Sequence, residues 1–349
     1  MKLVTIAMAC DERYLPGAIG TLASARMALD PGIAMEVFFM HESLSIPSFQ
    51  RIDNVLRRIE GKTTFRFHKI EEDFSAFPEF FYPSKLTYAR LLLPDLLKAE
   101  RVLYLDSDIL CLKPLLPLLE TDLAGAALGA VVEKRMPTLA ADPPVGSPIS
   151  CDLRQPYFNA GLLLLDLGKA RQSGLFKEAA RILASYPKSC KVYDQSALNY
   201  SVDGAFLQLD PSWNVQNHYD DFRPCAALQQ LKRKALNVHF VTRSKPWLEW
   251  SPFPAETMFR TLLEHVDKEF SNPQSTEMAR GKQIKCRLAR WLGAFYRGRS
   301  LLKGNKSGDL EAAKHWDQMH SDLTELRGLE TQVTALLGDW NAEIKAKTS

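Results

Sequence analysis

The chain has 349 residues, of which 46% are hydrophobic and 24% are charged, and its formal net charge is +3. This composition is typical of a globular protein with a sizeable core, and the small net charge argues against a nucleic-acid partner. The six cysteines are scattered and form no C-x-x-C pair, so we expect neither a zinc site nor a disulfide framework. We recognise no signal peptide and no apolar run long enough to span a bilayer, and therefore expect a cytoplasmic protein.

Up to about residue 270, apolar stretches alternate with stretches of helical spacing. Val, Ile, Leu and Phe dominate the apolar stretches, as buried strands require. We predict strands at Leu3–Ala9, Ala34–His41, Thr63–Ile70, Val102–Leu105, Ala126–Val132, Gly161–Leu165 and Leu236–Val241. Helices are expected from near Pro16, a favourable first-turn residue, and over Phe49–Ile59. This alternation predicts an α/β domain whose mainly parallel sheet is covered on both faces. Residues 134–156 lack a period and are predicted to form a long loop.

The predicted strand at Val102–Leu105 ends on two carboxylates, Asp106 and Asp108. Residues two apart in an extended chain point to the same side, so both carboxylates can converge on one hard cation. In open α/β sheets, ligands bind at the carboxyl ends of the strands. The alternative is a pair of turn aspartates that cap the next element, and a pattern as short as D-x-D leaves both interpretations open.

Two further polar groups adjoin predicted strands. Asp11-Glu12-Arg13-Tyr14 follows the first strand, where an acid beside an aromatic ring would either bind and stack on a base or form a turn. Tyr157-Phe158-Asn159-Ala160-Gly161 leads into another strand. The side chain of Asn159 offers a donor and an acceptor, and Gly161 permits the close approach of a ligand.

A third polar group, His239–Trp247, follows the last predicted strand. His239 is either a metal ligand or a structural histidine at a strand end. The ammonium group of Lys245 is suited to contact a phosphate. The spacing of these residues does not decide between the two interpretations of His239.

Together these segments resemble the retaining glycosyltransferases of family eight, which include bacterial lipopolysaccharide glucosyl- and galactosyltransferases and glycogenin. The resemblance covers residues 1–265. The family's motifs are matched by Leu86–Leu91 with its arginine, Asp106-Ser107-Asp108 (D-x-D), Phe158–Gly161 (F-N-A-G), Asp194-Gln195 (D-Q) and His239–Trp247 (H-x-x-G-x-x-K-P-W). The resemblance implies the GT-A fold, a Rossmann-like nucleotide-diphospho-sugar transferase fold with a mainly parallel central sheet. Two positions depart from the pattern, since Thr242 replaces the last motif's glycine and Arg13 stands where bacterial members often have Asn.

The resemblance also implies a hexose transfer with retention of configuration from a UDP-sugar, carrying galactose or glucose, to a saccharide acceptor such as lipopolysaccharide core. The resemblance implies that the metal is held by Asp106, Asp108 and His239. It implies that uracil and ribose are bound by Asp11 and Tyr14, and the diphosphate by Lys245. The sugar hydroxyls would be bound by Arg90, Asn159, Asp194 and Gln195, and the donor would also contact Ser107 and Gly161. Asp194 and Gln195 would act in catalysis. The cofactor would be Mn²⁺ (or Mg²⁺), since a mixed oxygen and imidazole set suits manganese. An amide is a poor nucleophile, so Gln195 near the anomeric carbon favours internal return.

Two other functions compete with this interpretation. A phosphatase of the haloacid dehalogenase type also places D-x-D after a strand, but that class favours Thr or Val where this chain has Leu110. A non-catalytic sugar-nucleotide or carbohydrate-binding protein is the second alternative. The joint presence of Asp106, Asp108, His239 and Lys245 argues for an enzyme, because a binding protein does not need all four.

The composition changes after residue 270, and we predict a catalytic domain at 1–270 followed by segments at 271–306 and 307–349. Arg280–Lys306 carries nine basic residues and no acidic one, with apolar residues on one helical face. This pattern predicts either binding to an anionic membrane, at its inner face, or a docked terminal helix with a solvated basic side.

In 309–347, apolar residues step by threes and fours in a short heptad pattern. The positions concerned are Trp316, Met319, Leu323, Leu326, Val333, Leu337, Trp340 and Ile344. This pattern predicts a helix that either mediates self-association or packs on the core of the same chain.

Overall fold

The computed structural model describes residues 2–79, 85–217, 231–241, 245–248, 254–273 and 330–348. The chain divides into two compact units. The first comprises Met1–Asn217, Leu236–Val241 and Lys347–Ser349, and the second comprises His218–Ala235 and Thr242–Ala346. Among the helices described, none is both long and apolar enough to span a bilayer. The predicted boundaries at residues 270 and 306 stay predictions.

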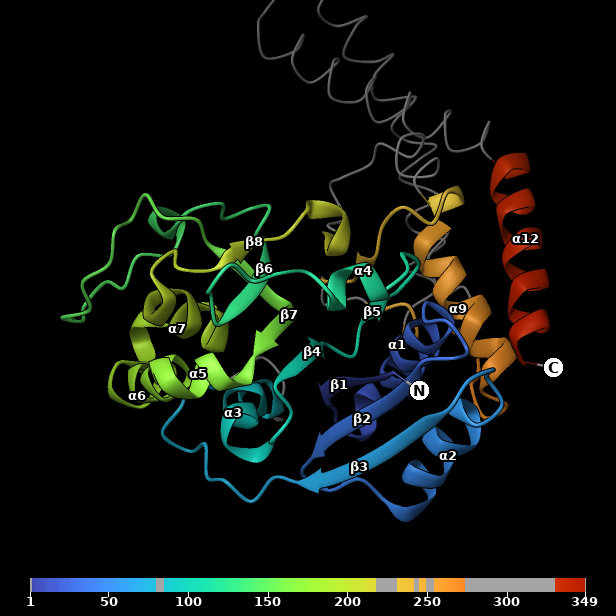
Figure 1. Ribbon diagram of the computed structural model, residues 1–349, viewed down its shortest axis with the longest axis horizontal. Helices are drawn as coiled ribbons and strands as arrows, with labels where there is room; N and C mark the ends of the chain where they lie inside the picture. Colours follow the sequence, from blue (N-terminus) through green and yellow to red (C-terminus); the bar gives the residue numbers. More distant parts are fainter. Residues whose placement is uncertain are drawn as a thin grey trace, which may run out of the picture. The chain divides into compact units, whose positions relative to one another are not determined.

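The first unit is built on a seven-stranded sheet with the order β3-β2-β1-β4-β7-β6-β8 (Figure 1). The strands are β1 (Leu3–Ala9), β2 (Ala34–His41), β3 (Thr63–Lys69), β4 (Arg101–Leu105), β6 (Leu128–Val132), β7 (Phe158–Asp166) and β8 (Leu207–Gln208). All neighbouring strands pair in parallel except where β7 meets β4 and β6, to which it is antiparallel. The predicted mainly parallel α/β sheet is thus confirmed. The loop between β6 and β7 contains no crossover helix, which is why the two strands run antiparallel.

The predicted strand positions agree best where the strands are long and fully paired. β1 and β2 match their predicted bounds, whereas β7 begins at Phe158, three residues before the predicted start. The prediction for Leu236–Val241 is too long, since β10 comprises only Val238–His239. It joins β5 (Ile109–Leu110) and β9 (Val215–Gln216) in a second, three-stranded sheet that the sequence did not predict. Strands of two residues carry no periodic signal, and only tertiary pairing defines them.

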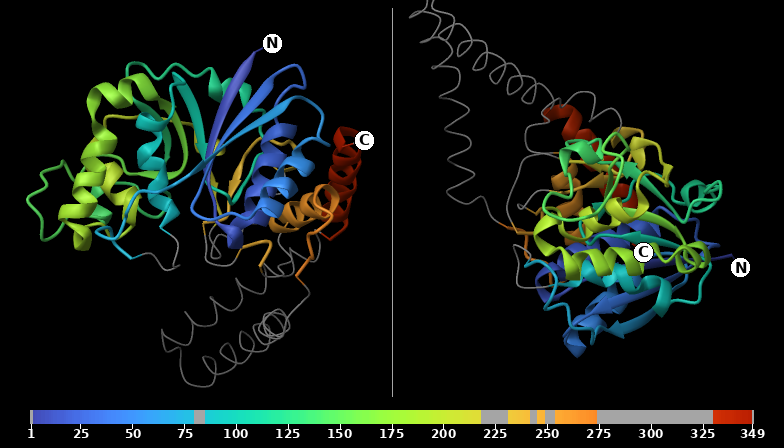
Figure 2. Two further views of the ribbon diagram at one scale, coloured as in Figure 1. Left: turned by 90° about the horizontal axis from the view of Figure 1, so that it is seen from below. Right: turned by 90° about the vertical axis from the view of Figure 1, so that its left-hand side faces the viewer.

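Helices cover both faces of the main sheet. Figure 2 shows α1 (Leu15–Met27) and α2 (Ile46–Leu56) on one side, and α5 (Leu167–Ser173), α6 (Leu175–Ser185) and α7 (Tyr193–Val202) on the other. α1 carries Pro16 in its first turn, as predicted. α2 begins before the predicted Phe49 because the hydroxyl of Ser45 accepts the N–H of Ser48 and caps the helix.

The short segments α3 (Leu93–Leu96) and α4 (Leu116–Leu119) complete the α-helices described in the first unit. Residues Leu86–Leu92, which include the motif arginine Arg90, form a 3-10 helix. Residues 134–156 form the predicted long loop, with one 3-10 turn at Leu139–Ala141. The buried carboxylate of Asp142 anchors this loop by accepting hydrogen bonds from the hydroxyls of Tyr157 (2.9 Å) and Ser196 (2.6 Å).

The second unit contains α9 (Pro254–Val266) and α12 (Glu330–Thr348) up to Ala346, and these two helices lie side by side (Figure 1). Leu336, Trp340 and Ile344, four residues apart, are buried, and Nε1 of Trp340 donates to the carbonyl of Met258 at 3.1 Å. This part of the predicted heptad segment therefore packs within the chain, with Leu336 in the buried position that we assigned to Leu337. Residues 280–306 and the heptad positions from 316 to 326 lie outside the described residues, and self-association stays a prediction.

Candidate active site

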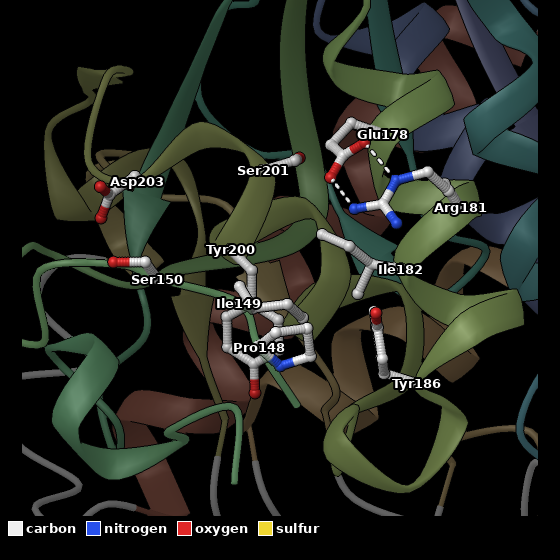
Figure 3. Close-up of a pocket in the computed structure, with 10 residues that line it drawn as sticks. All are labelled: Pro148, Ile149, Ser150, Glu178, Arg181, Ile182, Tyr186, Tyr200, Ser201 and Asp203. Atoms are coloured by element: carbon white, nitrogen blue, oxygen red, sulfur yellow. Dashed lines mark hydrogen bonds and ion pairs between the residues drawn. The ribbon is translucent and has the colours of Figure 1, made fainter. Parts of the chain in front are cut away.

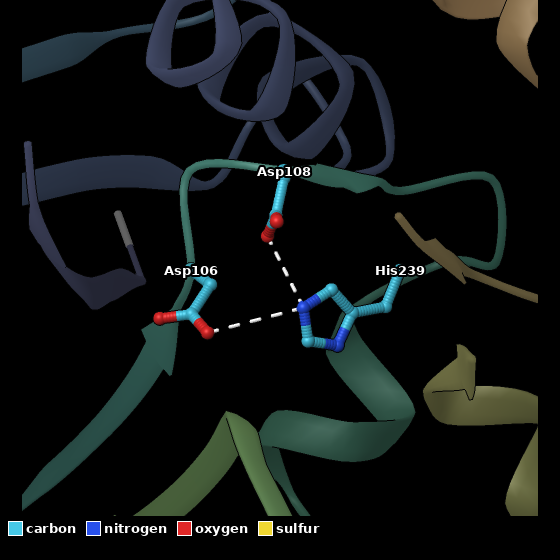
Figure 4. A group of neighbouring side chains, drawn as sticks. All are labelled: Asp106, Asp108 and His239. Carbon is cyan, nitrogen blue, oxygen red and sulfur yellow. Dashed lines mark ion pairs between the residues drawn. The ribbon is translucent and has the colours of Figure 1, made fainter. Parts of the chain in front are cut away.

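Asp106, Asp108 and His239 meet beyond the carboxyl end of β4 (Figure 4). The two aspartates follow β4, and β5 begins directly after Asp108. β10 pairs antiparallel with β5 and sets His239 opposite Ile109. Nε2 of His239 lies 3.1 Å from Oδ1 of Asp108 and 3.9 Å from Oδ2 of Asp106. One ligand atom of each residue lies within 4.8 Å of the others.

The donor set of these three residues fits a divalent cation. Two carboxylate oxygens and one imidazole nitrogen face one another, and a cation between them would remove the repulsion between the carboxylates. Oxygen with imidazole is a ligand set that manganese accepts. The three residues are the ones that the D-x-D and His motifs predicted, and the structure brings them together; their use as metal ligands stays a proposal.

Gly161 leaves the space that the ring of His239 fills. A Cβ atom at residue 161 would lie 2.1 Å from Cε1 of His239 and 2.9 Å from Oδ2 of Asp106. The N–H of Asp106 also donates to the carbonyl of Gly161 at 2.8 Å, which ties β7 to the strand end that carries the carboxylates. The structure shows that Gly161 admits a side chain of the site itself, and its expected contact with a ligand stays a prediction.

Arg90 and Tyr104 orient Asp106. Oδ1 of Asp106 accepts hydrogen bonds from Nη2 of Arg90 (2.9 Å) and the hydroxyl of Tyr104 (3.0 Å), which turns Oδ2 toward His239. The guanidinium also lies over the ring of Tyr104, 4.6 Å from its centroid. Burial favours the neutral form of Arg90, but Asp106 and Asp194 outweigh burial and raise its pKa, so the side chain stays charged.

The same guanidinium reaches Asp194 on α7. Nε of Arg90 lies 2.9 Å from Oδ2 of Asp194, and the hydroxyl of Thr87 donates to Oδ1 of Asp194 at 2.7 Å. Burial raises the pKa of Asp194, although the neighbouring Arg90 and the Thr87 hydroxyl act in the opposite direction. Arg90 thus joins the D-x-D and D-Q motifs, and the contacts of Arg90 and Asp194 with the donor sugar stay predictions.

Gln195 and Asn159 are held by the backbone of β7. Oε1 of Gln195 accepts the N–H of Ala160 at 3.0 Å, and Oδ1 of Asn159 accepts the N–H of Gly161 at 3.0 Å. Both side chains are buried. Hydrogen bonds therefore connect the F-N-A-G and D-Q motifs, which are far apart in the sequence. The roles of Asn159 and Gln195 toward the sugar stay predictions.

Two further residues of the site carried no sequence signal. Nδ2 of Asn159 donates to Oε2 of Glu133 at 2.9 Å, and Asn214 lies between Asn159 and His239. Each is a single polar residue outside any recognised motif. Only the tertiary structure brings them to the site. Glu133 directly follows β6, and Asn214 directly precedes β9, which pairs with the strand β10 that carries His239.

The remaining predicted residues lie at three places. The carboxylate of Asp11 accepts the N–H of Tyr14 at 3.0 Å and caps a 3-10 helix at Glu12–Tyr14, which matches the turn interpretation. Ser107 is buried between the two aspartates. Lys245 is buried in the second unit, and Thr242 lies outside the described residues. Binding of the donor by Asp11, Tyr14, Ser107 and Lys245 stays a prediction.

A separate cavity of about 400 Å³ lies at the C-terminal part of α7 (Figure 3). Its lining comprises Pro148, Ile149, Ser150, Glu178, Arg181, Ile182, Tyr186, Tyr200, Ser201 and Asp203. The two charged residues Arg181 and Glu178 pair with each other, with Nη2 of Arg181 2.6 Å from Oε1 of Glu178. None of the predicted site residues contributes to this cavity, so it has no part in the chemistry described above.

Comparison of the chain with known proteins identifies its family. The profile of glycosyl transferase family 8 matches residues 5–251. The lipopolysaccharide 1,2-glucosyltransferase of Escherichia coli K12 is 24% identical over 288 residues, covering 79% of this chain and 82% of the relative. The lipopolysaccharide 1,3-galactosyltransferase of Salmonella typhimurium is 24% identical over 266 residues, covering 73% of this chain and 76% of the relative.

The galactosyltransferase LgtC, solved in complex with donor and acceptor sugar analogues, is similar in structure. It is 25% identical, with a TM-score of 0.60, and the match covers 80% of this chain and 100% of LgtC. The family and the GT-A fold that the motifs predicted are thereby confirmed.

Proposed function

Because this chain belongs to glycosyl transferase family 8, we propose that it transfers a hexose, galactose or glucose, from a UDP-sugar to a saccharide acceptor with retention of configuration. The observation that carries the metal-dependent part is the convergence of Asp106, Asp108 and His239 within 4.8 Å. The acceptor we propose is lipopolysaccharide core or another cell-envelope glycan. The names of the Escherichia coli and Salmonella relatives support this choice.

Asp106, Asp108 and His239 would hold Mn²⁺ or Mg²⁺. When bound, the cation supplies Lewis-acid stabilisation of the negative charge that develops on the leaving diphosphate. Lys245 would add a positive charge on the same diphosphate, in the manner of electrostatic transition-state stabilisation. Asp11 and Tyr14 would bind the uridine, with Ser107 and Gly161 close to the donor.

Retention of configuration is best explained by internal return. The carboxylate of Asp194 is engaged by Arg90 and Thr87, which lowers its nucleophilicity, and the amide of Gln195 is intrinsically a poor nucleophile. We therefore propose that Asp194 and Gln195, with Arg90 and Asn159, position the hexose while the acceptor attacks from the face that the leaving group vacates.

A screen of UDP-sugars for UDP release tests the proposal. We expect hydrolysis or transfer with one UDP-hexose, loss of release on chelation, and recovery on addition of Mn²⁺ or Mg²⁺. A protein that binds a UDP-sugar but never releases UDP would instead be a non-catalytic binding protein. Phosphate release from phosphomonoesters without any UDP release would favour the phosphatase alternative.

We further propose that the basic segment 280–306 holds the protein at the inner face of an anionic membrane. Each basic residue near such a surface contributes about 1 kcal/mol, and salt screens this contribution. Replacing Arg287, Arg290, Arg297 and Arg299 with Ser should release the full-length protein from anionic liposomes in co-sedimentation at low salt. Point substitution is preferable to truncation because α12, which follows this segment, packs on α9. Wild-type protein that ignores anionic liposomes would contradict the proposal.

A further inference from the structure

A chain of buried side chains leads from His239 away from the carboxylates. Nδ1 of His239 lies 3.1 Å from Oδ1 of Asn214, and Nδ2 of Asn214 donates to Oδ1 of Asn159 at 2.9 Å. Nδ2 of Asn159 donates in turn to Oε2 of Glu133 at 2.9 Å. The four residues are between 1% and 6% exposed, so water does not compete for these hydrogen bonds. We call this set the amide relay.

Two groups of fixed polarity determine which way the amide of Asn159 points. The backbone N–H of Gly161 can only donate, so the atom of Asn159 that faces it must be the oxygen. Glu133 offers a carboxylate oxygen to the other side of the amide, where the NH₂ group can donate. Reversing the amide of Asn159 would therefore break both hydrogen bonds at once and leave buried polar groups unpaired.

This orientation is passed on to His239. Because Oδ1 of Asn159 is an acceptor, the atom of Asn214 at 2.9 Å must be its NH₂ group. The other terminal atom of Asn214 is then its oxygen, and it faces Nδ1 of His239. An oxygen there requires a proton on Nδ1, so Nε2, which faces Asp106 and Asp108, is the ring nitrogen left to bind a metal.

We propose that Asn159 and Asn214 are positioning residues that fix His239 as the Nδ1–H tautomer, so that Nε2 is available to a metal. The inference rests on the proposed metal-dependent function. It gives Asn159, which the F-N-A-G motif assigned to the donor sugar, a second role behind the metal site. Partners of this kind behind metal-bound histidines typically change metal affinity by 10- to 100-fold.

The tautomer can be read directly, without metal or turnover. Long-range ¹H–¹⁵N spectra of ¹⁵N-histidine-labelled full-length protein at pH 8, free of metal, distinguish a protonated Nδ1 from a protonated Nε2. The signals of His239 are assigned by their loss in His239→Gln. We expect Nδ1 to carry a proton in the wild type, and wild-type protein whose Nδ1 carries none overturns the proposal whatever the variants do.

Manganese affinity, measured by calorimetry, tests the relay in two backgrounds. Asn159→Leu frees Asn214 to rotate, and we expect the Kd for Mn²⁺ to rise about 10- to 100-fold. Asn214→Asp presents an oxygen to His239 in either orientation, but its second oxygen faces Oδ1 of Asn159, which is also an acceptor. Asn159→Leu removes that repulsion, so the double variant Asn159→Leu/Asn214→Asp should bind Mn²⁺ with a Kd within about threefold of wild type, because a carboxylate has no orientation to fix.

Other outcomes separate this inference from the proposed function. If Asn159→Leu raises only the KM for the UDP-sugar, and the tautomer and Mn²⁺ affinity stay as in wild type, Asn159 serves the donor alone and the relay is wrong. If Asn159→Leu does not fold, unchanged Mn²⁺ affinity in Asn214→Leu overturns the relay equally. If wild-type protein binds no Mn²⁺ although His239 is protonated on Nδ1, the metal part of the proposed function fails, and this inference fails with it.

Discussion

Asp108→Asn is expected to abolish metal-dependent UDP release while the protein keeps its fold. The substitution preserves the shape of a buried side chain and removes one negative charge beside His239. Losing a metal carboxylate costs several kcal/mol of transition-state stabilisation, and about 4 kcal/mol corresponds to about 10³-fold in rate. UDP release and Mn²⁺ calorimetry measure the effect, and thermal unfolding checks the fold.

Asp108 gives a cleaner test than Asp106. The carboxylate of Asp106 also accepts hydrogen bonds from Arg90 and Tyr104, so Asp106→Asn, which should be equally inactive, disturbs those partners as well. The matched control is Asp122→Asn, an exposed aspartate whose side chain caps the N–H of Ala124 at 2.9 Å. Near wild-type release by Asp108→Asn would refute the metal assignment, whereas the control should leave release unchanged.

The part of this site that the sequence predicts is the part that lies next to long strands. β1, β2 and β4 are mainly apolar runs, and the parallel register of β1 with β4 places the residues after them at one edge of the sheet. The position of Asp106 and Asp108 at a strand end follows from these runs alone. The metal-binding interpretation of His239 needed the family resemblance, because the spacing left a structural histidine equally open.

The contacts that complete the site depend on pairings across long sequence separations. β10 is two residues long, and its pairing with β5 is what carries His239 to the carboxylates. Nothing in the local sequence specifies that pairing, because such short strands are defined by tertiary packing. For the same reason, the roles of Glu133 and Asn214 could not be predicted from single polar residues in otherwise ordinary surroundings.

Two predicted site residues make contacts within the protein that the motifs do not reveal. The ring of His239 fills the space beside Gly161, whose contact with a ligand stays a prediction. Arg90 was predicted to contact the donor, and the structure shows it bridging Asp106 and Asp194, with its side chain only 5% exposed. Motif matching identifies such residues without revealing whether they face the ligand or hold the residues that do.

Arg90→Met should give the largest loss of stability of any single substitution at the site. Met keeps much of the apolar stem but removes a buried guanidinium that pairs with Asp106 and Asp194. Breaking a buried ion pair by removing one partner costs about 3 to 5 kcal/mol, since the other charge is left uncompensated. Urea unfolding at pH 7 measures the loss. Arg181→Met is the matched control, because its pair with Glu178 is exposed and screened by solvent.

The pH dependence of the Arg90→Met variant separates lost charge pairing from lost packing. Burial already raises the pKa of Asp194 in the wild type, against the influence of Arg90, so removing Arg90 raises that pKa further. A carboxyl group whose folded pKa exceeds its unfolded pKa binds more protons in the folded state, so the folded state loses stability as pH rises between the two values. Lowering the pH from 7 toward 4 should therefore restore part of the stability of Arg90→Met relative to wild type.

Asp194→Asn added to Arg90→Met should restore a similar part of the lost stability at pH 7. If the deficit is the same at both pH values and in the double variant, the cost arises from packing and the ion-pair explanation is wrong.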